Sequence, residues 1–431
     1  MVKKTLSSDQ FLKDIQGKNL NFLIGAGASV GLVNTLDLSQ LGESFEDLYS
    51  DKELNSRQRA ALDLIWFKSW IQDTLITKEK MDAISVKNSK GKKVFQNYKR
   101  FINNLGEFLD REGYDKPKRA NIFTTNYDSL FELVFDEVAQ NQRMIYFNDG
   151  SRGFLNRYIS TENFNLNISH SAMSDNFQRS IPTINLLKIH GSITWDLEKS
   201  NKKNSENSDK YIKRIKATIN NEVFEKVKIA ADNVMQRIEL TDFPIIDALF
   251  FHIYKKDLSN DKKKSVLQNL KDELNDFNEY PKDDPLANLG EQPSPLLQEF
   301  EKEYKNLQVV NPTKDKFRET VFQQNYYQLL RMLSFELEKR DSVLIVFGFS
   351  FADEHILEIV RRSLVNPYLK VYVICFNESS KIDLERKLGN VGPNKIDFIP
   401  YTDVHDGGKY TPTGNFDYLN WLFDGKSNGE E

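Results

Sequence analysis

The residue with the clearest chemical potential is His190, which ends the apolar stretch TINLLKIH at 183–190. It is one of only five histidines in the chain. An imidazole with an ordinary pKa of about 6.5 can accept a proton at neutral pH, so a histidine at the end of a core strand is suited to general-base catalysis. The alternative is a buried histidine whose ring is satisfied by a backbone carbonyl, and this stretch alone leaves both open.

A second group of polar side chains follows the apolar stretch ANIFT at 120–124. Thr125, Asn126 and Asp128 come directly after it. Hydroxyl, amide and carboxylate groups at the carboxyl end of a strand can hold a ligand in an open α/β sheet. The same residues can also have local roles, because Asp128 can cap a helix that begins at Ser129 and Asn126 can hold the turn.

A glycine-rich turn follows the first apolar stretch, in NFLIGAGASVGL at 21–32. Gly25 and Gly27 would let the backbone approach a phosphate, and the amides of the turn could donate to its oxygens. No lysine follows the second glycine, which excludes a nucleoside-triphosphate P-loop, and the six-position dinucleotide fingerprint is incomplete. Strand-to-helix turns also use glycine for geometry alone.

Polar groups also follow the last two apolar stretches. Asp353 could simply cap the helix that follows it. However, the carboxyl ends of parallel strands meet at one edge of a sheet, so polar groups after five such strands are more simply explained by one shared nucleotide site. The residues concerned are Gly348, Ser350, Asp353 and His355 in FGFSFADEHI, and Asn377 at the end of LKVYVICFN.

The stretches that carry these residues predict the fold. Each is continuously apolar, as strands covered on both faces of a parallel sheet are. Helical patterns lie between them at 127–140 and 352–364. This alternation predicts an α/β protein with an open, Rossmann-like parallel sheet. The predicted strands are 19–25, 120–126, 183–190, 342–350 and 369–377.

Two regions interrupt the alternation. Residues from about 40 to 118 have a mostly helical pattern, and residues 196–308 combine a polar, loop-like segment with helical stretches. We therefore expect 1–195 and 309–431 to form the sheet domain, with 40–118 as a helical insertion within it. Residues 196–308 are expected to form a second, mostly helical insertion.

Composition excludes several classes of protein. The formal net charge of −4 gives no reason to expect nucleic-acid binding. No apolar run is long enough for a signal peptide or a membrane span, so we expect a cytoplasmic protein. The single cysteine, Cys375, excludes an intrachain disulfide and any zinc site built from several thiolates, and we expect it to be a buried, inert thiol.

The motifs GAGAS, TTNYD, IHGS and GFS together resemble the sirtuin, or silent-information-regulator-like, family over about residues 18–35, 120–195 and 340–405. The resemblance implies an NAD-binding fold with the catalytic histidine at His190, and with Asn126 and Asp128 facing the nicotinamide ribose. The remaining cofactor-binding residues that it implies are Gly25, Ala26, Gly27, Ser29 and Thr125 around the first turn, and Gly348, Ser350, Asp353, His355 and Asn377 near the last strands.

The chain also departs from deacylating sirtuins. VGLVNTLDL replaces the isoleucine-proline-aspartate-phenylalanine-arginine segment, the four-cysteine zinc ribbon cannot form, and no strand for an acyl-lysine peptide is recognisable. The nucleotide half is kept without the peptide half, as in the prokaryotic branch that degrades NAD during phage infection. We therefore expect hydrolysis of NAD, as substrate, to nicotinamide and ADP-ribose, with no metal. The alternatives are an NAD-dependent protein deacylase and a catalytically silent sensor of NAD or ADP-ribose.

Such a hydrolase needs control, because unrestrained NAD loss would kill the host. The resemblance implies a separate HerA-type ATPase or a phage-derived activator as partner, and we expect neither a membrane nor direct nucleic-acid contact. We also expect a homo-oligomer whose subunits meet through apolar helical faces around Trp66, Phe67 and Trp70. The alternative is ordinary packing of these helices over the sheet.

Overall fold

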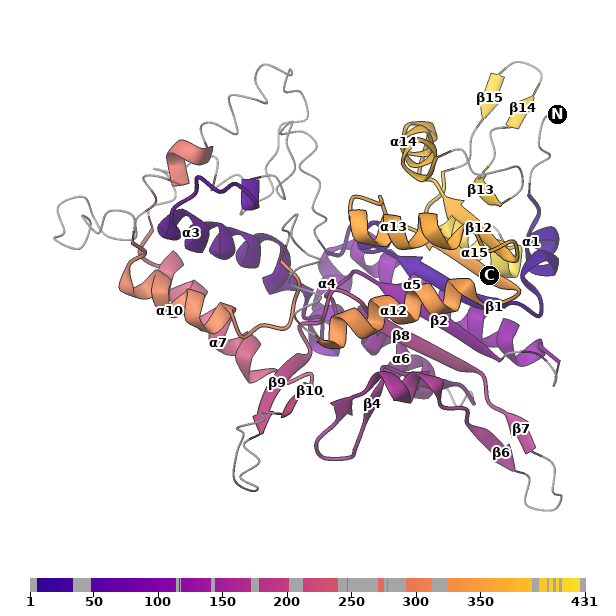
Figure 1. Ribbon diagram of the computed structural model, residues 1–431, viewed down its shortest axis with the longest axis horizontal. Helices are drawn as coiled ribbons and strands as arrows, with labels where there is room; N and C mark the ends of the chain where they lie inside the picture. Colours follow the sequence, from indigo (N-terminus) through magenta and orange to yellow (C-terminus); the bar gives the residue numbers. More distant parts are fainter. Residues whose placement is uncertain are drawn as a thin grey trace. The chain divides into compact units, whose positions relative to one another are not determined.

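The apolar stretches form the centre of a parallel sheet in the computed structural model (Figure 1). Each predicted strand ends one to three residues earlier than expected, because the turn residues that follow leave the sheet. The observed strands are β1 (Asn19–Ile24), β2 (Arg119–Thr124), β8 (Thr183–Lys188), β11 (Ser342–Phe347) and β12 (Leu369–Ile374).

Two short strands that the sequence did not predict complete the sheet. β3 (Tyr146–Asn148) and β13 (Ile396–Ile399) lie at its two edges. The seven strands have the order β13-β12-β11-β1-β2-β8-β3, and every neighbouring pair is parallel. The predicted α/β, Rossmann-like parallel sheet is thus confirmed.

The structure describes most of the chain but not all of it. The described residues are 6–33, 48–113, 116, 118–140, 144–171, 178–200, 212–238, 246, 270–274, 277, 292–311, 324–389, 395–400, 403–405, 408–410 and 413–426. Much of the polar segment that was expected to be a loop after residue 198 lies outside these ranges. Within the described part, no helix is both long enough and apolar enough to cross a membrane.

The chain divides into two compact units. Unit 1 consists of Met1–Leu32, Ile76–His190 and Val321–Glu431 and contains the sheet, whereas unit 2 consists of Val33–Leu75 and Gly191–Thr320. These limits differ from the domain boundaries drawn on the sequence. The helical region expected at 40–118 is split at Leu75, and its second half belongs to the sheet unit.

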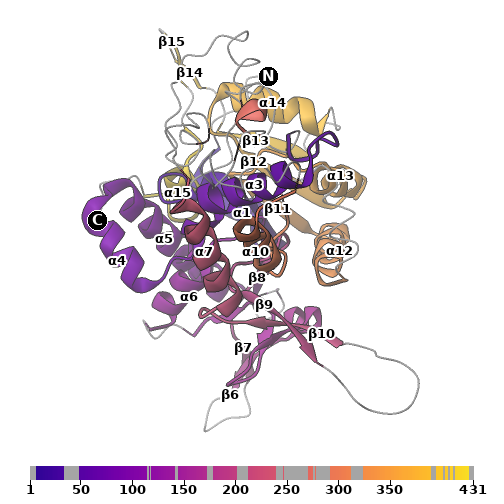
Figure 2. The ribbon, with the colours of Figure 1, turned by 90° about the vertical axis from the view of Figure 1, so that its left-hand side faces the viewer.

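Helices cover both faces of the sheet in unit 1. α5 (Ser89–Arg111), α6 (Leu130–Gln140) and α15 (Phe416–Asp424) lie on one side, and α12 (Gln324–Glu338) and α13 (Glu354–Ser363) on the other (Figure 2). The remaining helices of this unit are α1 (Ser8–Ile15), α4 (Lys78–Lys87) and α14 (Glu378–Leu388). Helices on both faces explain why the strands are continuously apolar.

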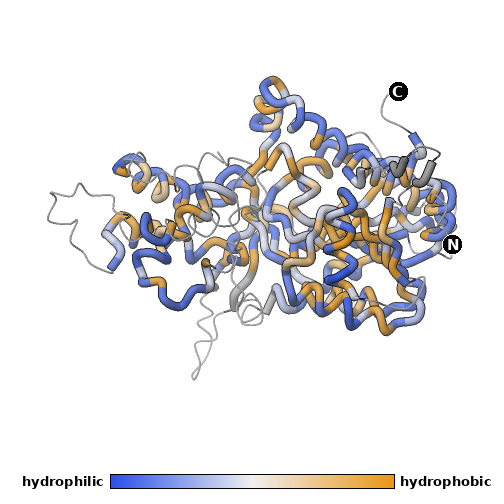
Figure 3. Tube along the Cα trace, turned by 90° about the horizontal axis from the view of Figure 1, so that it is seen from above, coloured by the Kyte–Doolittle hydropathy of each residue, from blue (hydrophilic) through white to orange (hydrophobic). Residues whose placement is uncertain are grey.

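The core of unit 1 is aromatic on the side of α5 and α15. The ring of Phe22 lies edge-on to that of Phe101 at 5.2 Å, and Phe423 contacts both rings. The trace in Figure 3 shows a concentration of hydrophobic residues in the interior, with hydrophilic residues mostly around it. Edge-to-face ring pairs of this kind stabilise a core by about 0.5–1.5 kcal/mol each beyond the area that they bury.

A ladder of four buried asparagines crosses the middle of the sheet. Asn121 donates from Nδ2 to Asn21 Oδ1 at 2.9 Å, Asn185 to Asn121 at 2.8 Å, and Asn148 to Asn185 at 2.9 Å. Its members stand at registered positions on β1, β2, β8 and β3. The ladder ends on Ser342 Oγ and on the backbone N–H of Gly150, so each amide group has a partner.

Unit 2 is built from helices and one described hairpin. Its elements are α3 (Ser56–Trp66), the π-helical turn η3 (Phe67–Ile71), the 3-10 turn η4 (Gln72–Thr74), β9 (Trp195–Ser200), β10 (Ile212–Ala217), α7 (Glu222–Met235) and α10 (Pro295–Tyr304). β9 and β10 pair in antiparallel fashion, and α7 packs on α10.

The apolar helical face expected to meet another subunit is instead buried within unit 2. Trp66, Phe67 and Trp70 are at most 6% exposed. Phe67 lies between Phe224 of α7 and Phe300 of α10, with ring centroids at 5.8 and 6.1 Å. Phe67 is thus covered within its own unit, and a contact between subunits through these helices stays a prediction.

Short elements complete the described structure. They are η1 (Ala26–Ser29), β4 (Ser151–Arg152), β5 (Tyr158–Ile159), η5 (Thr161–Asn165), β6 (Ser169–Ser171), β7 (Gln178–Ser180), β14 (Asp403–His405) and β15 (Gly408–Tyr410).

Candidate functional site

The strand order places a topological switch point between β1 and β11. From β1 the chain crosses to β2 on one side, and it later returns to β11 on the other side. In open α/β sheets, ligands bind outside the carboxyl ends of the strands at such a point. The glycine turn after β1 and the turn after β11 both lie at this edge.

Close packing of these two turns explains their glycines. A Cβ on Gly25 or Gly27 would lie 2.6–2.8 Å from the backbone of Gly348, and the N–H of Gly27 donates to the Gly348 carbonyl at 2.9 Å. Gly348 has φ +61, which suits glycine. The contact accounts for the glycines without a phosphate, while exposed Ala26 and Gly27 leave the outer surface of the turn accessible. Phosphate binding there stays a prediction.

Ser29, Asn126 and Asp128 meet in one buried network behind the turn. Ser29 Oγ donates to Asp128 Oδ2 at 3.2 Å, and it accepts from Asn126 Nδ2 at 3.3 Å. Tyr98 of α5 lies 2.8 Å from the same oxygen and completes the set as a donor. All four side chains are at most 6% exposed.

One atom of this network has no partner. Asn126 Oδ1 is buried and makes no hydrogen bond. An unpaired buried acceptor costs about 1–3 kcal/mol relative to a satisfied one, and such groups are rare in folded proteins. A ligand hydroxyl that donated to this oxygen would remove the deficit.

Burial also changes the ionisation of the network. It raises the pKa of Asp128 above its ordinary value of 3.8, against the opposing effect of Lys188 and the N–H of Leu130. Burial and the charge of Asp128 likewise raise the pKa of Tyr98, so Tyr98 stays a hydrogen-bond donor at physiological pH.

An ion pair between buried Lys188 and Glu132, whose side chain is 26% exposed, lies next to the network. Lys188, with a side chain only 3% exposed, lies 2.6 Å from Glu132 Oε1 of α6 and donates to the backbone carbonyl of Asp128. Burial raises the pKa of Glu132, and Lys188 opposes this rise. The pair ties the start of α6 to β8, two residues before His190.

His190 follows β8 as Asn126 follows the neighbouring strand β2. Thr124 of β2 pairs with Lys188 of β8. Asn126 comes two residues after Thr124, and His190 comes two residues after Lys188. The ring of His190 is buried, and its Nε2 lies 3.0 Å from Asp353 Oδ2. The turn after β11 therefore reaches the histidine directly.

The other predicted site residues lie at the rim of this edge. Thr125 and His355 are partly exposed, and Ser350 is exposed with its carbonyl accepting from Lys387 Nζ at 3.0 Å. Asn377 is exposed and caps α14, where its Oδ1 accepts from the N–H of Ser380 at 2.8 Å. The contacts that these residues make do not indicate whether they bind a ligand.

Sequence reasoning missed three residues of the site. Tyr98 lies in a helix that was assigned to an insertion, and nothing in its own segment connects it with Ser29. Lys188 offered a usable signal, because a lysine inside a buried apolar strand needs a partner, whereas the partly exposed Glu132 offered none.

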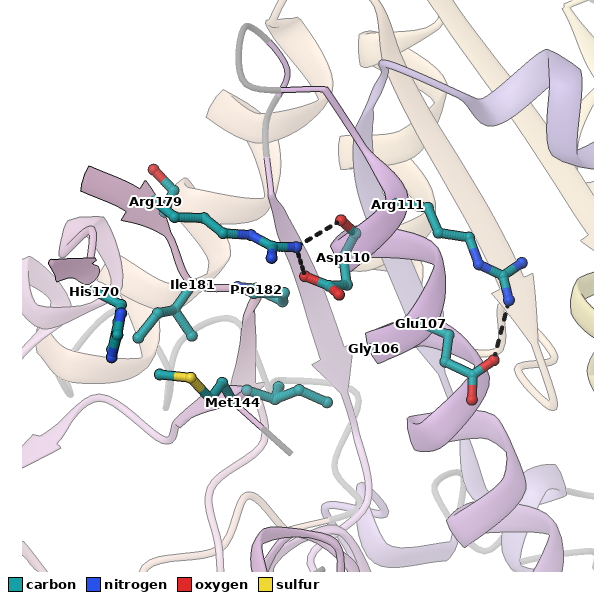
Figure 4. A pocket seen from close by; sticks show the side chains of 11 residues that line it. Gly106, Glu107, Asp110, Arg111, Met144, His170, Arg179, Ile181 and Pro182 are labelled. Atoms are coloured by element: carbon teal, nitrogen blue, oxygen red, sulfur yellow. Dashed lines mark hydrogen bonds and ion pairs between the residues drawn. The ribbon is translucent and has the colours of Figure 1, made fainter. Parts of the chain in front are cut away.

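A cavity of about 510 Å³ lies away from this edge, near the amino ends of the strands (Figure 4). Arg179 pairs there with Asp110, and Arg111 with Glu107. His170 and Met144 also line it. The polar groups singled out from the sequence include none of its lining residues.

The described residues also bear on metals and thiols. Within the part of the chain that the structure describes, no three His, Cys, Asp or Glu side chains gather as metal ligands. Cys375 is buried as predicted, and burial raises the pKa of its thiol to about 12, which keeps it protonated and unreactive.

Comparison with protein families matches residues 120–234 to the SIR2-like domain. The match begins in β2, contains Asn126, Asp128 and His190, and covers less than half of the chain. No curated protein matches the chain. Together with the parallel sheet, the match supports a sirtuin-like domain.

Proposed function

We propose that this protein hydrolyses NAD to nicotinamide and ADP-ribose, with the reaction at the carboxyl edge of β1, β2, β8 and β11. The SIR2-like match supports an NAD-related function at this coarser level. The observation that carries the finer proposal is an unsatisfied buried acceptor, Asn126 Oδ1, after β2, together with a buried histidine, His190, after the neighbouring strand β8. A ribose hydroxyl suits the first and a water molecule the second.

The reaction requires two things of the protein: it must position the substrate, and it must supply one base. Nicotinamide departs from a cationic ring as a neutral molecule, so its departure needs no acid. Water adds to the ribose carbon and must lose a proton, and His190 would accept it. Positioned proton transfer of this kind is worth about 10²–10⁴-fold in rate.

The other residues of the network would hold the substrate. Asn126 would accept from a ribose hydroxyl, and its own orientation depends on Ser29, which Asp128 and Tyr98 hold in place. Because these groups are already hydrogen-bonded to one another, little reorganisation is needed when NAD binds.

Hydrolysis is favoured over deacylation by the chain itself. A single cysteine cannot supply the zinc ribbon of deacylating sirtuins, and the sequence offers no strand for an acyl-lysine peptide. We further propose a regulated, cytoplasmic anti-phage effector that assembles with itself and with a separate HerA-type ATPase. The family resemblance alone supports that part. Any assembly surface must lie elsewhere than at Phe67, which its own unit buries.

One incubation tests the reaction. The full chain is given NAD without any acyl peptide, and nicotinamide and ADP-ribose are quantified. We expect equimolar release, which His190→Ala abolishes and His170→Ala leaves unchanged. His170 is the matched control because it is exposed and lines the remote cavity. Release only with an acyl peptide would mean deacylation, and NAD binding without release would mean a sensor.

A mass measurement tests assembly. We expect a homo-oligomer at micromolar concentration, and a strictly monomeric protein would contradict that part of the proposal alone.

A further inference from the structure

Asp353 contacts both the candidate base and the start of a helix. It is the N-cap of α13, and its Oδ1 accepts from the N–H groups of His355 at 3.0 Å and Ile356 at 3.2 Å. Its Oδ2 lies 3.0 Å from Nε2 of His190, and the two side chains are 6% and 9% exposed. One oxygen of the carboxylate thus caps α13, and the other faces the ring of His190.

We propose that Asp353 is the positioning residue of His190 and not a nucleotide contact. An ionised carboxylate only accepts, so the facing Nε2 must carry a hydrogen. In the neutral ring the lone pair is then on Nδ1. Asp353 therefore selects one tautomer and one ring orientation, and Nδ1 is the nitrogen that can accept a proton. This last step rests on the proposed function, whereas the tautomer does not.

The backbone holds Asp353 rigidly enough for this role. Its turn includes Gly348 at φ +61, which packs on Gly27, and Phe351 at φ +52, which is 1% exposed. A non-glycine residue in the left-handed region is maintained only where its surroundings demand it. Buried on one side and capping a helix on the other, the carboxylate cannot follow the ring if the ring moves.

The sharpest variant is Asp353→Asn. The two backbone N–H groups at the start of α13 need an acceptor, so the amide oxygen faces them and the NH₂ group faces His190. Nε2 must then accept, and the hydrogen moves to Nδ1. The helix cap is kept, so the variant is expected to fold. Asp353→Ser also keeps a capping oxygen, but its side chain is too short to reach the ring.

The test is ¹⁵N NMR of the ring nitrogens in histidine-labelled full chain, without NAD, at about pH 8. The His190 signals are assigned by their loss in His190→Ala. We expect the Nε2–H tautomer in the wild type, the Nδ1–H tautomer in Asp353→Asn and a mixture in Asp353→Ser. Glu354→Gln is the matched control, since it removes an exposed carboxylate from the same helical turn and should change nothing.

An unchanged tautomer in folded Asp353→Asn, or a doubly protonated ring in the wild type, would overturn the inference. Turnover provides a second readout: Asp353→Asn should lose at least about 100-fold in NAD hydrolysis. If the wild type does not hydrolyse NAD but the tautomer changes as stated, the proposed function fails and the positioning role stands.

Discussion

Two buried polar networks differ in how completely their groups are paired: one crosses the sheet, and the other lies at its carboxyl edge. In the asparagine ladder of the middle, each amide is paired with the next and both ends are closed. At the carboxyl edge, the network around Ser29 contains a carboxylate with a raised pKa and an asparagine oxygen with no partner. A network in which every polar group is paired stabilises and specifies a fold. A network with one unpaired acceptor can still accept a hydrogen bond from a ligand.

Charge is a further difference between the two. The ladder is neutral, whereas the edge contains the ion pair Lys188–Glu132 beside Asp128. Removing one member of a buried ion pair leaves the other uncompensated, which is more destabilising than removing both. The comparison therefore predicts a different response of each network to substitution.

The largest effect is expected from Lys188→Met. The carboxylate of Glu132, whose Oε2 is buried, would be left without its cation, and we expect the free energy of unfolding to fall by about 3–5 kcal/mol. Urea denaturation measures this loss. The double variant Lys188→Met/Glu132→Leu should recover most of the lost stability, and a single variant as stable as the wild type would show that the pair has no structural role.

Asn126→Ala should separate activity from stability. We expect NAD turnover to fall by at least about 100-fold, which corresponds to about 2.7 kcal/mol in the barrier. Stability should change by no more than about 1 kcal/mol, because one long hydrogen bond is lost and an unsatisfied oxygen is removed with it. Near-normal turnover in this variant would exclude Asn126 from the site.

Asn121→Ala, at the centre of the ladder, should show the converse. Asn21 Oδ1 would lose its donor, and the unsatisfied group alone should lower the free energy of unfolding by roughly 1–3 kcal/mol. Turnover per folded molecule should match the wild type. A variant that stays stable but loses activity would mean that the ladder belongs to the functional site. That result would contradict the distinction between a structural and a functional network.

The smallest effect is one of pH. Because the pKa of Asp128 is raised in the folded state, its contribution to stability is present below its ordinary value of 3.8 and is lost as pH rises through the folded-state pKa. Asp128→Asn lacks this titration. The stability of the wild type relative to Asp128→Asn should therefore decrease with rising pH and then level off. Urea denaturation at a series of pH values measures this, and a difference that increases with pH would contradict the assigned shift.

Much of the fold could be read from the sequence because burial on both faces leaves a plain signal. Continuous apolar runs located all five central strands, and the polar residues after them marked the edge where the site lies. β3 and β13 were missed because an edge strand of three or four residues carries too little pattern. The sequence alone left open what covers Trp66 and Phe67, since an apolar helix surface does not reveal whether its own chain or another one packs on it; the structure shows both side chains buried.

By itself, the sequence determined the sheet, its carboxyl edge and the presence there of His190, Asn126 and Asp128. These follow from local composition, which sets which segments are strands and which residues end them. Only the tertiary structure decided that Asp353 contacts His190, that Tyr98 joins Ser29, and that the glycines of the first turn pack against Gly348. Each of these contacts joins segments far apart in the chain, and strand order brings them together, which no local pattern encodes.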